Sequence, residues 1–162
     1  MSNLTGSDDP WRSPAWIDRT RVLLDSYRRW LGRDLIPRSG AATEDSQHLF
    51  EASFVVVAHG TEPDPILNYA NRQALELWET DLPTLLSTPS RKTAEPVHRD
   101  ERAGMLAQAA RDGFIDNYGG IRISTTGRRF RIEQAIIWNL LSDDGQPAGQ
   151  AATFERWERV GE

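Results

Sequence analysis

The sequence contains no cysteine, and this absence removes several kinds of chemistry at once. Disulfides, thiolate metal sites and cysteine nucleophiles are excluded. A flavin photoadduct is excluded as well, because that chemistry needs a cysteine beside the flavin. A chain without cysteine also suits a reducing compartment, so we expect a cytoplasmic location.

Long hydrophobic runs and an excess of basic residues are missing too. No apolar segment approaches the roughly 20 residues that a membrane-spanning helix needs. The polar, acidic residues 1–10 have neither the basic start nor the apolar middle of a signal peptide. The formal net charge of -5 and the pI near 5.3 are unlike the basic footprint of a nucleic-acid binder. We therefore expect neither a membrane nor a nucleic acid as a partner.

The most informative segment that is present is residues 66–78, which read as a short strand running directly into a helix. Asn71 stands where a helix N-cap is needed, and Ala74, Leu75 and Trp78 then share one helical face. A strand that ends in Tyr-x-Asn and is followed at once by an apolar helix resembles the second strand and first helix of PAS-type sensor domains. The resemblance implies a domain that holds a ligand or a partner.

The chain of 162 residues fits one domain with an extension. We predict a disordered tail over residues 1–13, and an amphipathic helix over 14–31 that ends at Gly32. A linker follows as far as residue 46, and the core domain spans 47–160. The N-terminal helix has two possible roles, folding back on the sheet or mediating a homodimer, and the sheet is an alternative dimer surface.

The core domain reads as α+β. Segments that are rich in β-branched residues, or that alternate polar and apolar residues, predict five strands. The strand predicted over residues 114–124 is expected to bulge at Gly119 and Gly120. We expect a five-stranded antiparallel sheet with helices 71–79 and 97–112 on one face. The predicted strands are residues 53–59, 66–70, 114–124, 128–141 and 149–157, and a short helical turn is predicted at 81–86.

Several blocks in the correct order make the resemblance more specific, and the chain is similar to the MEKHLA domain over roughly residues 15–158. That family is PAS-like and occurs in stand-alone bacterial proteins and in some plant homeodomain transcription factors. The resemblance implies a sensory or interaction role, with no known reaction and no ligand to carry over. The string that names the family is absent as a run, so the match rests on residues 54–60, 66–79, 89–97, 113–124 and 127–133.

Gln134 is a candidate ligand-binding residue, because alternation places it in the middle of an apolar face of strand 128–141. A buried amide has to find partners, either in a ligand or in neighbouring backbone and water. Trp78, Tyr118 and Trp138 form an aromatic pocket or simply belong to the core. Arg91 lies in the irregular segment 89–96, which resembles the family, and its side chain either stabilises this loop or contacts a ligand. The full candidate set is Asn71, Leu75, Trp78, Arg91, Tyr118, Ile132, Gln134, Ile136 and Trp138.

Metal and catalytic patterns are missing. The three histidines show no metal-ligand spacing, and His98, at the start of the helix that carries the iron ligand in haem-binding PAS domains, has very polar neighbours that favour a solvated first turn. The arginines of residues 128–131 either clamp an anion or form a solvated strand face. No paired acid and base is apparent. We therefore predict no enzyme activity and assign no cofactor.

These observations favour a PAS-like sensory or interaction domain that binds a small molecule or a partner protein. With no output domain of its own, it would pass the signal through the N-terminal helix to a partner chain. Two alternatives stay open: a small enzyme using the pocket for proton transfer, and a purely structural dimerisation module with a filled core.

Overall fold

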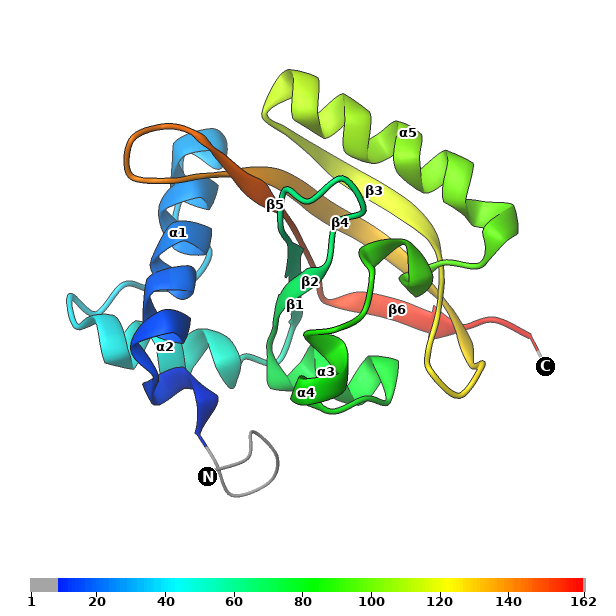
Figure 1. Cartoon of the computed structure of the whole chain (residues 1–162), viewed down its shortest axis with the longest axis horizontal. Helices are drawn as coiled ribbons and strands as arrows, with labels where there is room; N and C mark the ends of the chain where they lie inside the picture. The colour runs from blue at the N-terminus through cyan, green and yellow to red at the C-terminus, as the bar shows by residue number, and fades with distance from the viewer. Residues whose placement is uncertain (1–8, 162) are drawn as a thin grey trace.

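The structure is a computed structural model that describes residues 9–161. One antiparallel sheet forms its centre, with the strand order β2-β1-β5-β4-β3 and with β6 paired to β4 (Figure 1). The predicted α+β class and the antiparallel sheet are confirmed. The strands are β1 (Val55–His59), β2 (Leu67–Ala70), β3 (Phe114–Ile123), β4 (Arg129–Leu141), β5 (Pro147–Phe154) and β6 (Arg156–Arg159).

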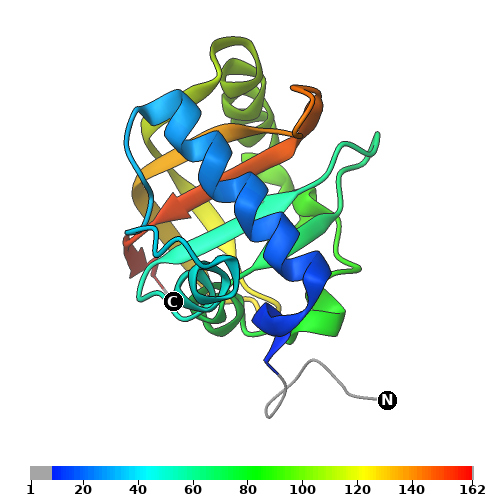
Figure 2. The same ribbon diagram turned by 90° about the vertical axis from the view of Figure 1, so that its left-hand side faces the viewer.

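Helices cover both faces of this sheet. One face carries α5 (Pro96–Asp112), which lies over β3 and β4, together with α3 (Arg72–Trp78) against β1 and β2. The opposite face carries α1 (Pro14–Leu31), which crosses the strands diagonally (Figure 2). The remaining helices are η1 (Pro10–Arg12), α2 (Ala42–Phe50), α4 (Leu82–Leu85) and η2 (Ser90–Thr93).

The limits of α1 follow from local signals and match the predicted range. Ser13 caps the helix by accepting a hydrogen bond from Trp16 N at 3.2 Å, and Gly32 ends it in the left-handed conformation with φ 74°. The apolar side of α1 is buried on the sheet, where Trp138 Nε1 of β4 donates to Leu23 O at 3.2 Å. Of its two predicted roles, α1 therefore takes the first and folds back on the sheet.

The predicted tail and linker are more ordered than expected. Residues 1–8 of the tail lie outside the described residues, but Pro10–Arg12 form a 3-10 turn, and Trp11 is buried. The second half of the linker is helical, since α2 begins at Ala42. Asp45 explains this order, because its buried carboxylate accepts hydrogen bonds from Ser39 N at 2.9 Å and from Arg38 Nε at 3.2 Å.

The alternation predicted for β4 is wrong in its second half, because the strand contains a bulge. Between Ile132 and Ala135 the pairing with β3 slips by one residue, and Gln134 takes φ 55°. A compensating slip in β3 lies between Ile115 and Tyr118, where Asn117 takes φ 56°, close to the bulge predicted at the two glycines. Each extra residue exchanges the two faces of its strand.

The bulge in β4 also explains the sixth strand. Ile136 pairs with Thr153 of β5 and Glu133 pairs with Arg156 of β6, so β5 and β6 run along the same edge of β4. They are interrupted at Glu155, opposite the bulge. The single last strand predicted over 149–157 is therefore present as two pieces.

Candidate functional site: a cavity beneath helix α5

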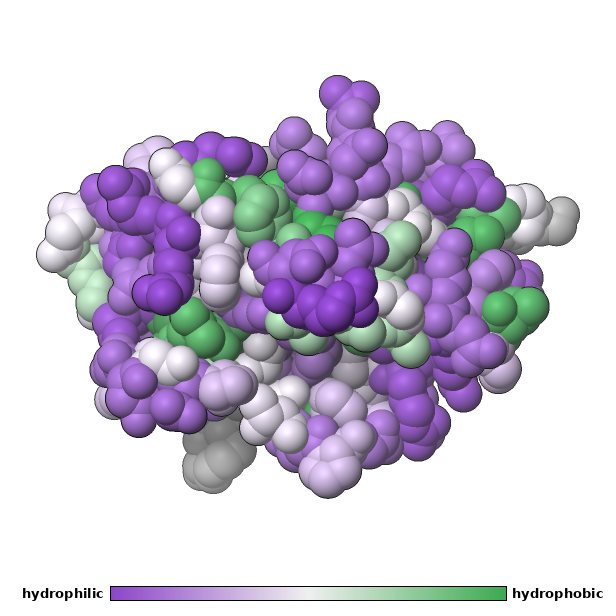
Figure 3. All heavy atoms as spheres, turned by 90° about the horizontal axis from the view of Figure 1, so that it is seen from above, coloured by the Kyte–Doolittle hydropathy of each residue, from purple (hydrophilic) through white to green (hydrophobic). Residues whose placement is uncertain are grey.

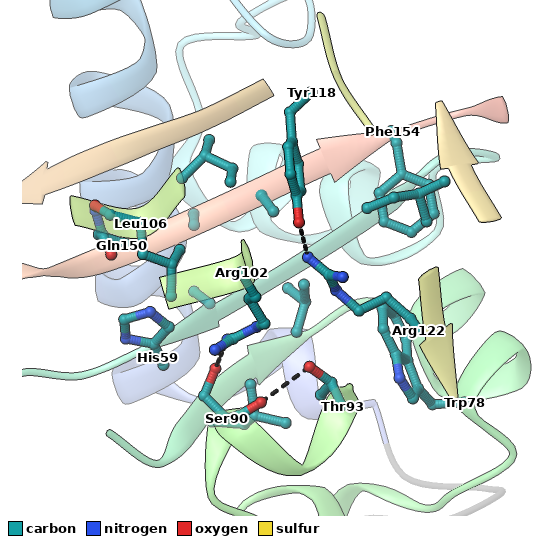
Figure 4. Close-up of a pocket in the computed structure, with 17 residues that line it drawn as sticks. His59, Trp78, Ser90, Thr93, Arg102, Leu106, Tyr118, Arg122, Gln150 and Phe154 are labelled. Atoms are coloured by element: carbon teal, nitrogen blue, oxygen red, sulfur yellow. Dashed lines mark hydrogen bonds between the residues drawn. The ribbon is translucent and has the colours of Figure 1, made fainter. Parts of the chain in front are cut away.

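A cavity of about 50 Å³ lies between the sheet and the segments η2 and α5 (Figure 4). Most of its lining is apolar, with side chains from four strands and from α3 and α5. Its polar lining comes from a few side chains that point inward: His59, Ser90, Thr93, Arg102, Tyr118, Arg122 and Gln150. Within residues 9–161, no aspartate or glutamate lines it.

Two guanidinium groups approach the cavity from opposite sides. Arg102, from α5, donates to Ser90 Oγ. Arg122, from β3, is only 5% exposed and donates through Nη1 to Ile121 O at 2.8 Å and through Nη2 to the hydroxyl of Tyr118. Neither arginine pairs with a carboxylate in the described part of the chain. The cavity is therefore positively charged.

The charge of Arg102 is destabilised by its surroundings. Burial, together with the like charge of Arg122, lowers the pKa of Arg102 to about 10. Buried charges in proteins are normally paired, because moving an isolated charge out of water is costly. Neutral hydroxyls of serine and tyrosine offset only part of that cost.

Two residues of the lining each carry a buried polar atom without a hydrogen-bond partner among the described residues: His59 Nε2 and Trp78 Nε1. His59 Nδ1 lies 3.0 Å from Gly60 O and must carry the proton, because a carbonyl only accepts. The neutral imidazole therefore presents Nε2 as an acceptor, while the indole presents a donor. Burial lowers the pKa of His59 and favours this neutral form.

A chain of amide hydrogen bonds connects the cavity with α1. Gln150, at the cavity, donates from Nε2 to Leu106 O at 2.9 Å and to Asn139 Oδ1 at 3.1 Å. Asn139 Nδ2 donates to Ala109 O at 3.0 Å, and Trp30 Nε1 of α1 donates to Asn139 O at 2.9 Å. The end of α1 and the end of α5 thus share one residue of β4 as a hydrogen-bond partner.

Other kinds of site find no support in the part of the chain that the structure describes. Its histidines and acidic residues form no cluster of metal-binding size. None of its helices has the length and apolar character needed to cross a membrane. The face seen from above is largely hydrophilic, with hydrophobic residues scattered in small groups (Figure 3).

The sequence pattern described as the MEKHLA domain matches residues 17–159. The chain belongs to the MEKHLA domain family. Among curated proteins, it is 28% identical over 159 residues to the homeobox-leucine zipper protein HOX32 of Oryza sativa subsp. japonica, covering 98% of this chain. It is 24% identical over 161 residues to ATHB-15 of Arabidopsis thaliana, covering 99%. This MEKHLA domain spans only 18% and 19% of those two relatives.

Solved structures place the MEKHLA domain among PAS and light-oxygen-voltage (LOV) folds. A PAS domain from Colwellia psychrerythraea superposes with a TM-score of 0.60 at 11% identity, covering 72% of this chain and 94% of that one. The LOV protein of Rhodobacter sphaeroides gives a TM-score of 0.55 at 10% identity, covering 68% and 61%. At these identities the likeness shows the fold alone.

The cavity of the MEKHLA domain contains Trp78, Tyr118 and Ile132 from the nine candidate residues. The bulge turns Ile136 and Trp138 away, and Trp138 packs edge-on against Tyr27 of α1. The other candidates have different surroundings: Gln134 is exposed, Leu75 borders a surface groove, Asn71 is buried with four protein partners, and Arg91 pairs with Asp64 at 3.2 Å.

The arginines of residues 128–131 favour the solvated interpretation, since each of the three pairs with a carboxylate at the surface. Arg128 pairs with Glu79 at 3.4 Å, Arg129 with Glu95 at 2.6 Å and Arg131 with Glu158 at 3.7 Å. His98 lies at the rim of a surface groove, outside the lining of the cavity under α5.

The sequence prediction missed both cavity arginines. A signal for Arg102 exists, since Arg102, Leu106 and Ala109 follow the i, i+4, i+7 spacing of one helical face. Arg122 is four residues from Tyr118, a separation that places both on the same side of a strand. An arginine on the apolar side of a helix is the pattern that indicates a buried charge.

Proposed function

We propose that this MEKHLA domain is a small-molecule sensor whose cavity beneath α5 receives the ligand. The observation that carries the proposal is the set of buried polar atoms without partners, His59 Nε2 and Trp78 Nε1, beside two arginines without counter-charges. Buried polar groups are normally hydrogen-bonded. Their presence on side chains that line one cavity supports a site that is completed by a bound molecule.

The output of the sensor is proposed to run through α1. Occupancy of the cavity acts on Gln150 and Leu106, and Asn139 connects these residues to Trp30 near the end of α1. Helix α1 buries its apolar side on the sheet, so a change in its packing exposes apolar surface to a partner chain. The same surface would then also serve a homodimer.

The alternative functions have less support. Proton-transfer chemistry needs a paired acid and base, and the described lining offers an imidazole and a phenol but no carboxylate. A purely structural module is expected to fill its core, whereas this domain keeps a cavity with charged walls.

Native mass spectrometry of the whole chain purified from its host tests the proposal. We expect a bound mass on the wild-type protein and its loss from Ala152→Leu, which fills the cavity from β5, because Ala152 pairs with Ile137 and Val57 on the cavity face of the sheet. Ala148→Leu, on the same strand but outside the lining, is the matched control and should keep the mass. A wild-type protein that carries no small molecule at any loading would contradict the sensor function.

A further inference from the structure

We propose that the cavity binds a small carboxylate, whose anionic group is held between Arg102 and Arg122. This inference rests on the proposed sensor function and names its ligand class. The structure presents the two guanidinium groups at one cavity, from α5 and from β3, with hydroxyl groups as their only side-chain partners within residues 9–161. A carboxylate is the missing counter-charge.

The remaining donors fit the same chemistry. A guanidinium carries several N–H donors, and Arg102 directs one of them to Ser90 while the others stay available. Trp78 Nε1 adds a donor that has no partner in the described chain. Charge-assisted hydrogen bonds from arginine to a carboxylate are among the strongest in proteins, and they are stronger where water is excluded.

The size and the walls of the cavity limit the ligand further. A volume of 50 Å³ corresponds to about three to five water-sized atoms, at roughly 10–15 Å³ for each. Apolar side chains such as Leu106, Ile137 and Phe154 complete the lining. An anion with a short apolar tail fits the small volume, the arginines and the apolar walls, so the preferred ligand class is a short-chain monocarboxylate.

The neutral His59 is compatible with this ligand. Its Nε2 is an acceptor, and it gains a partner only from a group that carries a proton. The nearby charge of Arg102 opposes protonation of the imidazole, and that of Glu62 favours it. An anion bound at Arg102 would offset the first effect, but burial, the main cause of the lowered pKa of His59, persists and keeps the imidazole a neutral acceptor.

The test titrates the whole chain with acetate, propionate and butyrate at constant ionic strength, and follows the Trp78 indole N–H resonance, assigned with Trp78→Phe. Propionamide serves as the uncharged analogue of propionate, and phosphate tests for binding of an inorganic anion. We expect saturable shifts with propionate, and none with propionamide or phosphate. Arg102→Met should raise the propionate Kd at least about tenfold, or about 1.4 kcal/mol. Arg111→Met, on the exposed side of α5, should leave it unchanged.

Thermal unfolding of the same variants separates binding from a structural role. Removing a partly buried charge that has no counter-charge within residues 9–161 should leave the melting temperature of Arg102→Met equal to or above that of the wild type. A lower melting temperature with unchanged propionate affinity would make Arg102 structural and overturn the inference.

The arms also distinguish the inference from the proposed function. Binding of propionamide, abolished by Ala152→Leu, would reject the carboxylate but keep the sensor. Binding of phosphate without propionate would replace the ligand class with an inorganic anion. No response in any arm, together with no mass carried by the protein from its host, would reject both.

Discussion

Asn71 shows how one side chain can hold several segments together. Its Oδ1 accepts from Ala74 N at 3.2 Å and from Val56 N at 3.1 Å, while Nδ2 donates to Leu49 O at 3.1 Å and to Phe54 O at 2.8 Å. The expected N-cap is confirmed, and it is one of four bonds. The residue joins the end of α2, the start of β1 and the start of α3.

Asn71→Ala should therefore cost considerably more than a lost cap. An N-cap alone contributes about 1 kcal/mol, but this change also leaves buried backbone groups without partners, and we expect a loss of at least about 3 kcal/mol. Asp81→Ala is the matched control, because exposed Asp81 caps α4 and its side-chain hydrogen bonds within residues 9–161 are confined to Thr84. Urea unfolding measures both, and equal losses would show that the extra bonds of Asn71 contribute nothing.

His59 should make stability depend on pH. Burial lowers its pKa below the ordinary value of 6.5, so the unfolded chain takes up the proton first as the pH falls. The folded state is then fully favoured above about pH 6.5 and loses free energy below it, at up to about 1.4 kcal/mol per pH unit. His59→Gln should remove this part of the slope in urea unfolding between pH 6.5 and 5. His48→Gln, on the surface, should keep it.

At the scale of elements, the bulges of β3 and β4 decide which side chains reach the cavity. Ile132 and Ile137 are an odd number of residues apart, yet both line it. Regular alternation would place them on opposite faces. The bulge at Gln134 thus lets the first half of β4 and the centre of its second half contribute to one site, while Trp138 serves the other face.

Gln134→Gly should stabilise the domain by about 0.5–1 kcal/mol, because glycine adopts φ 55° without the steric cost that other residues meet there. Glu133→Gly is the control. Glu133 is an exposed neighbour in regular strand conformation, where glycine should lower the free energy of unfolding by a similar amount. Differential scanning calorimetry compares the two, and the same sign for both changes would contradict the bulge.

The sequence predicts the elements well because their signals are local. Ser13 and Gly32 mark the ends of α1, and Asn71 marks the start of α3. The site is harder to predict, because one non-glycine residue with positive φ exchanges the two faces of a strand. No sequence signal at Gln134 or Asn117 predicts that conformation. The burial of Arg122 depends likewise on α5 packing over β3, which is a long-range contact.

At the scale of the whole molecule, Asn139 should couple the cavity to α1. If a carboxylate draws α5 and β5 together, propionate should slow amide hydrogen exchange in the last turn of α1, and Asn139→Ala should abolish that response by removing the bonds to Gln150 and Ala109. Arg28→Gln, an exposed change on α1, should retain it. A response that survives Asn139→Ala would mean that the signal takes another route.

The paired bulges also have a genetic consequence. Because Asn117 and Gln134 compensate each other, Phe114 and Ile115 pair with Trp138 and Ile137 as if neither strand had an extra residue. Loss of the single codon for Gln134 would remove only the extra residue, and regular alternation would then keep Ile132 and Ile137 on the cavity face. Loss of the codon for Ile136, in the regular part of β4, would instead turn Trp138 toward the cavity and Ile137 toward α1. One-codon deletions in the regular part of β4 should therefore be far more damaging than most missense changes, whereas the codon for Gln134 is the position in this strand where a deletion is best tolerated.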